Sequence, residues 1–140
     1  MGACCPHCGV DDCEAKFDAC LDRDFSDPEY GVVHHLMVGA YMMQHGRYTD
    51  ENVQGTADFL LRHLDEPPSE ATKREIRRWA DGPYRVIRRA GESARDTADV
   101  LWPLSIGDID LTTADRYRTC VRRWAEAVAR TARRNSPRSF

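Results

Sequence analysis

Five of the six cysteines in this chain lie within its first 20 residues, and this cluster limits what the chain can fold into. The motif Cys-Pro-His-Cys-Gly at residues 5–9 places two thiols on one turn, and Cys13 follows shortly after. Thiolates with this spacing can bind one ion together, because a tight turn brings both sulfurs to about 2.3 Å from it. Glycine accepts the positive φ that such turns need. The sequence therefore predicts an N-terminal zinc knuckle built from Cys5, Cys8 and Cys13.

The cell compartment in which the protein resides determines whether its cysteines form a metal site or disulfides. No run of residues approaches the roughly 18 apolar residues that a membrane helix needs, and the start of the chain does not resemble a secretory signal. We therefore expect a cytoplasmic protein without membrane contact. Because thiols stay reduced in that compartment, clustered cysteines favour metal or redox chemistry over a disulfide framework.

The predicted zinc site needs a fourth ligand, because three cysteines leave one position of a tetrahedral ion open. The candidates are His34, His35 and His45, which lie on one expected helix. His34 and His45 are eleven residues apart, about 16 Å along a helix, so both cannot bind the same ion. We place His34 at the fourth position. His45 and Tyr41 share its helix face and would line a groove that leads away from the ion.

Helix start and stop signals recur along the chain, and the alternating pattern of strands is essentially absent. The sequence predicts an all-α fold, a small bundle of about five to six helices with the zinc knuckle at its N-terminus. Asp11 or Asp12 should cap the first helix with its side chain, and Asp27-Pro28 should start the second. The first expected helix begins at residue 11 or 12 and ends near residue 24. The next four cover residues 28–44, 50–64, 70–79 and 84–90, and the last begins at residue 112 or 113 and ends near residue 132.

One domain accounts for all 140 residues, because two pieces of this length would bury little core. Residues 1–46 should form the metal-binding knuckle and the first two helices, and residues 47–140 a helical body with a basic C-terminal helix. Residues 1–66 hold 13 acids and 4 bases, whereas residues 67–140 hold 10 acids and 16 bases. No aromatic-interleaved basic stripe accompanies these bases, so a nucleic-acid partner is disfavoured and a small molecule or protein is expected.

Three motifs carry a resemblance to a known family. They are Cys-Pro-x-Cys-Gly at residues 5–9, Cys13 with Phe17 four residues later, and His-x-Leu-x-Val-x-Ala-Tyr-x-x-Gln-His at residues 34–45. With these motifs the chain resembles an uncharacterised bacterial family, a domain of unknown function, over nearly its whole length. The chain departs from that family in two places. The loop between Cys8 and Cys13 is shorter, and Gly46 stands where the family usually has a proline after the final histidine. The resemblance draws attention to His34, Tyr41, Gln44 and His45, and implies no activity.

Three functions are compatible with these residues. The favoured one is an accessory or binding protein with a structural zinc. The first alternative is a zinc enzyme in which water fills the fourth position. In that enzyme His34 or His45 would act as general base, and Tyr41 would donate a hydrogen bond to developing negative charge. The second is a dithiol oxidoreductase that uses Cys-Pro-His-Cys, although such dithiols follow a buried strand and no strand pattern precedes residue 5.

Overall fold

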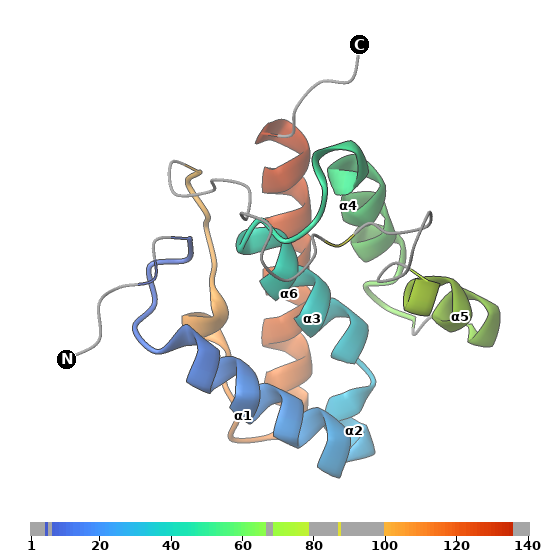
Figure 1. Cartoon of the computed structure of the whole chain (residues 1–140). Coiled ribbons are helices and arrows are strands. Elements are labelled where there is room, and N and C mark those ends of the chain that lie inside the picture. The colour runs from blue at the N-terminus through green and yellow to red at the C-terminus, as the bar shows by residue number, and fades with distance from the viewer. Residues whose placement is uncertain (1–4, 6, 67–68, 79–86, 88–99, 136–140) are drawn as a thin grey trace.

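The computed structural model describes residues 5, 7–66, 69–78, 87 and 100–135, and these residues form a helical fold (Figure 1). Within this part of the chain there is no strand, only an isolated bridge between Tyr48 and Ile87. The predicted all-α fold is confirmed. The α-helices are α1 (Cys13–Ser26), α2 (Pro28–Gly31), α3 (His34–Gln44), α4 (Val53–Arg62), α5 (Glu70–Arg78) and α6 (Ala114–Asn135), and the 3₁₀ helices are η1 (Asp50–Asn52) and η3 (Ile106–Asp108).

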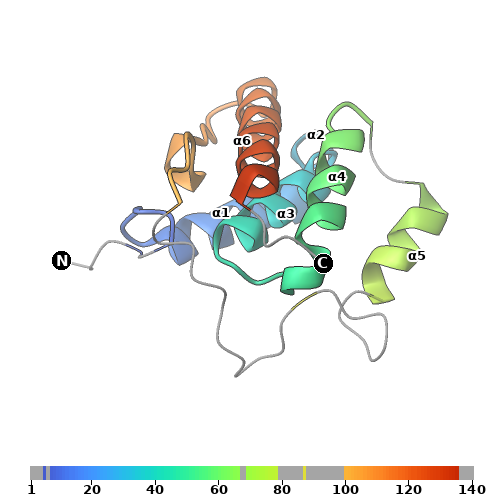
Figure 2. The same ribbon diagram turned by 90° about the horizontal axis from the view of Figure 1, so that it is seen from above.

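Helix α6 forms the centre of the core. Helices α3 and α4 pack directly against it, while α1 and α2 lie side by side across one end (Figures 1 and 2). The apolar residues of α6 recur at helical spacing and present one stripe to the other helices. Among them, Tyr117, Val121, Trp124, Ala125 and Val128 are completely buried. None of the described helices combines the length and the apolar character that crossing a membrane requires.

The start of α1 differs from the prediction. The helix begins at Cys13, and Asp12 precedes it in a left-handed conformation with φ 53°. The Asp12 side chain makes no capping hydrogen bond, so the predicted side-chain cap is wrong for this residue. Aspartate is among the few residues that adopt this conformation at modest cost. Its backbone therefore turns the chain from the knuckle into the helix.

The helix predicted from residue 28 to 44 is interrupted, because Val32 and Val33 separate α2 from α3. The predicted start is confirmed, since Asp27 Oδ1 accepts a hydrogen bond from the Glu29 amide at 2.9 Å. Tyr30 Oη then donates to the Leu111 carbonyl at 3.1 Å. Tertiary contacts of this kind override local helix propensity. The break lets α3 leave in a new direction towards α6.

The other predicted boundaries fall close to those observed. The helix expected over 50–64 is η1 followed by α4, and α6 begins after Thr113, whose hydroxyl accepts a hydrogen bond from the Arg116 amide. The short helix predicted at 84–90 lies outside the described residues apart from Ile87, as does Trp79 at the end of the predicted fourth helix.

Gly31 provides a test of the close packing of α2 on α1. A Cβ atom at this position would lie 2.6 Å from the Asp24 carbonyl oxygen, so Gly31→Ala must push the two helices apart. We expect the free energy of unfolding to fall by about 1–3 kcal/mol in urea titrations. The control is Gly55→Ala within α4, because a Cβ atom at this position would meet nothing within 4 Å. This substitution should stabilise the helix by up to about 1 kcal/mol. Equal effects of the two substitutions would contradict this packing.

Candidate metal centre

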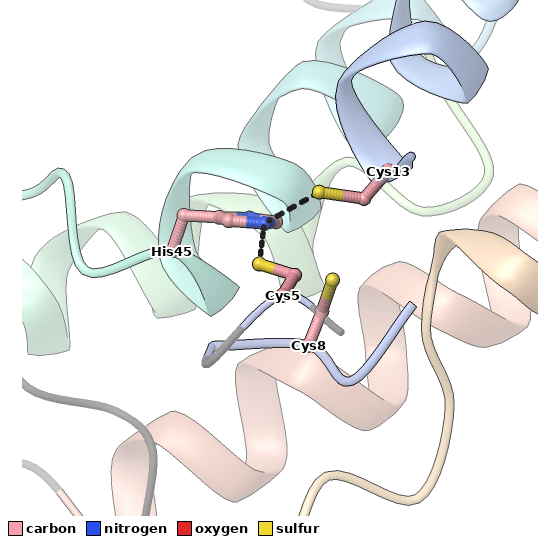
Figure 3. Close-up of side chains that lie close together, drawn as sticks. All are labelled: Cys5, Cys8, Cys13 and His45. Carbon is pink, nitrogen blue, oxygen red and sulfur yellow. Dashed lines mark hydrogen bonds between the residues drawn. The ribbon is translucent and has the colours of Figure 1, made fainter. Parts of the chain in front are cut away.

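Three cysteines and one histidine converge between the start of the chain and the end of α3. The Sγ atoms of Cys5, Cys8 and Cys13 and a ring nitrogen of His45 all lie within 4.8 Å of one another (Figure 3). His45 Nε2 is 3.5 Å from Cys5 Sγ and 3.5 Å from Cys13 Sγ. In a tetrahedral zinc site with normal bond lengths, a sulfur and a nitrogen are about 3.6 Å apart. The four side chains could therefore hold one metal ion.

The knuckle that carries Cys5 and Cys8 is closed by backbone hydrogen bonds. The Gly9 amide donates to the Cys5 carbonyl at 2.8 Å, and the Cys5 amide donates to the Val10 carbonyl at 3.4 Å. Gly9 has a φ of 74°, a conformation that glycine adopts without the cost a side chain would add. The turn thus presents both thiols to the same side, as the sequence predicts.

Helix α1 positions the third sulfur. Cys13 is the first residue of this helix and is only 8% exposed. Tyr41 Oη lies 3.6 Å from Cys13 Sγ, within hydrogen-bonding distance for sulfur. The third sulfur of the cluster is therefore held in place and shielded from solvent.

The end of α3 positions the imidazole. His45 is the C-cap residue of α3, and Gly46 follows it with a φ of 67°. The Gly46 amide donates to the Met43 carbonyl at 3.2 Å and the Arg47 amide to the Met42 carbonyl at 3.0 Å, which is the hydrogen-bond pattern of a Schellman motif. This helix end places His45 at a defined point beside the knuckle.

A hydrogen bond also sets the orientation of the ring. His45 Nδ1 lies 2.7 Å from the Tyr41 carbonyl oxygen, to which it can only donate. Nε2 then keeps its lone pair and faces the sulfurs, an arrangement typical of metal-binding histidines. The ring stacks on Tyr41 with centroids 4.0 Å apart, and Tyr41 stacks on Phe17 of α1 at 4.1 Å. Burial lowers the pKa of His45, which favours the neutral form that binds metals.

Electrostatics within the cluster favour a bound cation. Burial raises the pKa of Cys8 to about 12, and the nearby Cys13 and Cys5 thiolates add to this shift by repulsion. For Cys5, burial also opposes ionisation, but hydrogen bonds from the Cys8 and His7 amides outweigh it and lower the pKa. Three thiolates at this distance repel one another unless a cation neutralises them. A divalent ion would supply that charge and favour all three thiolates.

His34, which the sequence analysis places at the fourth position, lies elsewhere. Its Nδ1 is 2.8 Å from Asp24 Oδ2, and Oδ1 of this buried carboxylate accepts a hydrogen bond from Tyr117 Oη at 2.7 Å. His35 is also remote from the knuckle, with Nε2 2.8 Å from the His63 carbonyl oxygen. The histidine that the structure brings to the sulfurs is His45. The physical reason is the direction of α3, whose C-terminal end and not its N-terminal end meets the knuckle.

Gln44 has a structural role next to this site. Its completely buried side chain accepts a hydrogen bond from Trp124 Nε1 at 3.0 Å and donates to the Leu104 carbonyl at 3.0 Å. These bonds anchor the last turn of α3 to α6 and to the segment before η3. No local sequence pattern predicts this role, because the two hydrogen-bond partners of Gln44 lie 60 and 80 residues further along the chain.

Comparisons with known proteins give one finding. The chain matches the family described as "Family of unknown function (DUF5946)" over residues 3–133. This match covers all four side chains of the cluster and confirms the resemblance to a domain of unknown function. Searches of curated proteins and of solved structures give no match.

Substitution of each histidine in turn distinguishes the two ends of α3. We expect His45→Ala to lose the metal, because it removes a donor atom, and His34→Ala to keep it. His34→Ala should instead lower the free energy of unfolding by about 1–3 kcal/mol, because it leaves the buried Asp24 carboxylate without one partner. Elemental analysis by mass spectrometry and urea unfolding measure the two effects. Metal loss in His34→Ala with retention in His45→Ala would contradict the geometry.

Proposed function

We propose that this chain, which belongs to the DUF5946 family of unknown function, is a zinc protein whose metal ties the N-terminal knuckle to the helical body. The ligands would be Cys5, Cys8, Cys13 and His45. One observation carries the proposal: His45 Nε2 lies 3.5 Å from two of the sulfurs while its other ring nitrogen is held by a backbone carbonyl. A preoriented imidazole beside three thiols is the donor arrangement of a structural zinc site.

The donor set favours zinc over other common metals. Thiolates select soft or borderline ions, so calcium, magnesium and manganese are disfavoured. Zinc accepts tetrahedral geometry without electronic cost, and three cysteines with one histidine are a common structural set. The spacing of the four donors, all within 4.8 Å, suits one ion of this size.

A structural role fits the site better than a catalytic one. Four protein donors complete a tetrahedron, whereas catalytic zinc sites keep a position for water or substrate. A His45 that binds the metal cannot act as a general base. Tyr41 is directed at Cys13 Sγ, and burial raises its pKa, so it stays a hydrogen-bond donor. The alternative of a zinc enzyme that uses Tyr41 and His45 as catalytic residues is therefore disfavoured.

The dithiol oxidoreductase is disfavoured by the position of the helix. In thioredoxin-like proteins the first cysteine of the motif lies at a helix N-terminus, which lowers its pKa. Here α1 begins only at Cys13, and both Cys5 and Cys8 lie on the knuckle before it. Helix-assisted activation of the first thiol is thus missing from the described geometry.

A zinc ion at this place would join three separate segments: the knuckle, the start of α1 and the end of α3. The loop of residues 5–12 is too short to bury a hydrophobic core of its own. Metal binding would therefore supply the free energy that orders this loop. We propose that the ordered knuckle serves an accessory or binding role, as a surface for a protein or small-molecule partner.

Metal analysis of the purified protein tests the zinc site. We expect one zinc per chain, and we expect Cys8→Ser to lose it, because a tetrahedral site with three remaining protein donors binds far more weakly. Zinc at 100 times its Kd stabilises a fold by about 2.7 kcal/mol, so loss of the ion should lower Tm by at least about 5 °C. Cys120→Ser in α6, outside the cluster, is the control and should keep both zinc and Tm. Zinc-free wild-type protein, or a zinc-loaded Cys8→Ser variant, would contradict the proposal.

A further inference from the structure

We propose that Cys5 and Cys8 are a peroxide-reactive pair: hydrogen peroxide oxidises them to a disulfide and releases the zinc, while Cys13 stays reduced. This inference rests on the proposed zinc site and adds a modification and its chemistry. Three observations support it, namely the unequal exposure of the sulfurs, the hydrogen bond at Cys13 and the shape of the knuckle.

The three sulfurs differ in their protection. Cys5 and Cys8 are half-buried, whereas Cys13 is 8% exposed and buried at the start of α1. Tyr41 Oη, 3.6 Å from Cys13 Sγ, can donate a hydrogen bond that draws negative charge from this thiolate. Oxidation follows thiolate character and exposure. A small oxidant from solvent therefore meets the two sulfurs of the knuckle first.

The knuckle also favours a bond between these two sulfurs. Cys5 and Cys8 lie on one short turn, closed by the hydrogen bond from the Gly9 amide to the Cys5 carbonyl. Their Sγ atoms already lie within 4.8 Å of each other, and a Cβ atom added at Gly9 would meet nothing within 4 Å, so that side of the turn has room to adjust. A bond from Cys5 to Cys13 would instead pull the knuckle against a packed helix. A disulfide needs two Cα atoms within roughly 7 Å of each other, which two cysteines three residues apart on one turn can provide.

The reaction balances in two steps. A knuckle thiolate attacks one peroxide oxygen, the O–O bond breaks, and the leaving hydroxide takes a proton to become water. The resulting sulfenic acid is attacked by the second thiolate, so that an S–S bond forms, the S–O bond breaks and a second hydroxide leaves as water. Two electrons pass from the two thiolates to the peroxide. In sum, two thiolates, one hydrogen peroxide and two protons give one disulfide and two waters.

Loss of the ion follows from the loss of ligands. A disulfide sulfur is a poor zinc ligand, so only Cys13 and His45 would remain as donors. The knuckle would then lose its tie to the end of α3. Reduction with a dithiol regenerates both thiolates and allows zinc to bind again. The same four side chains thus form a reversible, peroxide-sensitive link between the knuckle and the helical body.

The experiment uses the 140-residue chain with Cys4→Ser and Cys120→Ser, because these changes remove two thiols outside the proposed ligand set. Cys20 can stay, since it is completely buried and burial raises its pKa to about 11. The zinc content is measured first. Hydrogen peroxide is then added with a chromogenic zinc chelator, and the products are analysed by intact mass and by peptide mapping without reduction.

We expect one zinc released per chain, a mass lower by two hydrogen atoms and a disulfide between Cys5 and Cys8, all reversed by dithiothreitol and added zinc. Two results would overturn the inference and leave the zinc site intact: zinc retained at a peroxide level that fully oxidises glutathione, or a disulfide that contains Cys13. Protein without zinc before peroxide is added would overturn the zinc site itself, and the inference with it.

Discussion

The approach of His45 to three cysteine sulfurs connects the N-terminal knuckle to the helical body. Its Nε2 lies 3.5 Å from Cys5 Sγ and from Cys13 Sγ, which come from a loop and from the start of α1. The start of the chain and the end of α3, which are 32 to 40 residues apart at these contacts, thereby share one small volume. In the proposed zinc site, a divalent cation bound here would favour all three thiolates and neutralise their charge.

Hydrogen bonds to the helical body fix the end of α3 that carries His45. Gln44 bridges Trp124 and the Leu104 carbonyl, so the last turn of α3 is fixed to α6 immediately before His45. The Schellman end at Gly46 and the stack of Phe17, Tyr41 and His45 then set the direction of the imidazole. A site that is buttressed in this way from several elements is preorganised, which reduces the entropy lost when an ion binds.

Local features of the site and fold were predictable from the sequence, and non-local ones were not. The all-α fold and the knuckle at residues 5–9 follow from periodicity and spacing within short windows. The choice between His34 and His45 depends on which end of α3 meets the knuckle. That direction is set by the break at Val32 and Val33 and by the hydrogen bonds of Gln44, which no local pattern encodes. The sequence could show only that one histidine at most would fit.

The most direct test of the central claim is X-ray absorption at the zinc edge of the purified wild-type protein. We expect a first shell of three sulfurs at about 2.3 Å and one nitrogen at about 2.0–2.1 Å, with the outer-shell scattering of one imidazole. A first shell with fewer than three sulfurs, one without imidazole scattering, or one that includes a water oxygen in place of the nitrogen would contradict this claim.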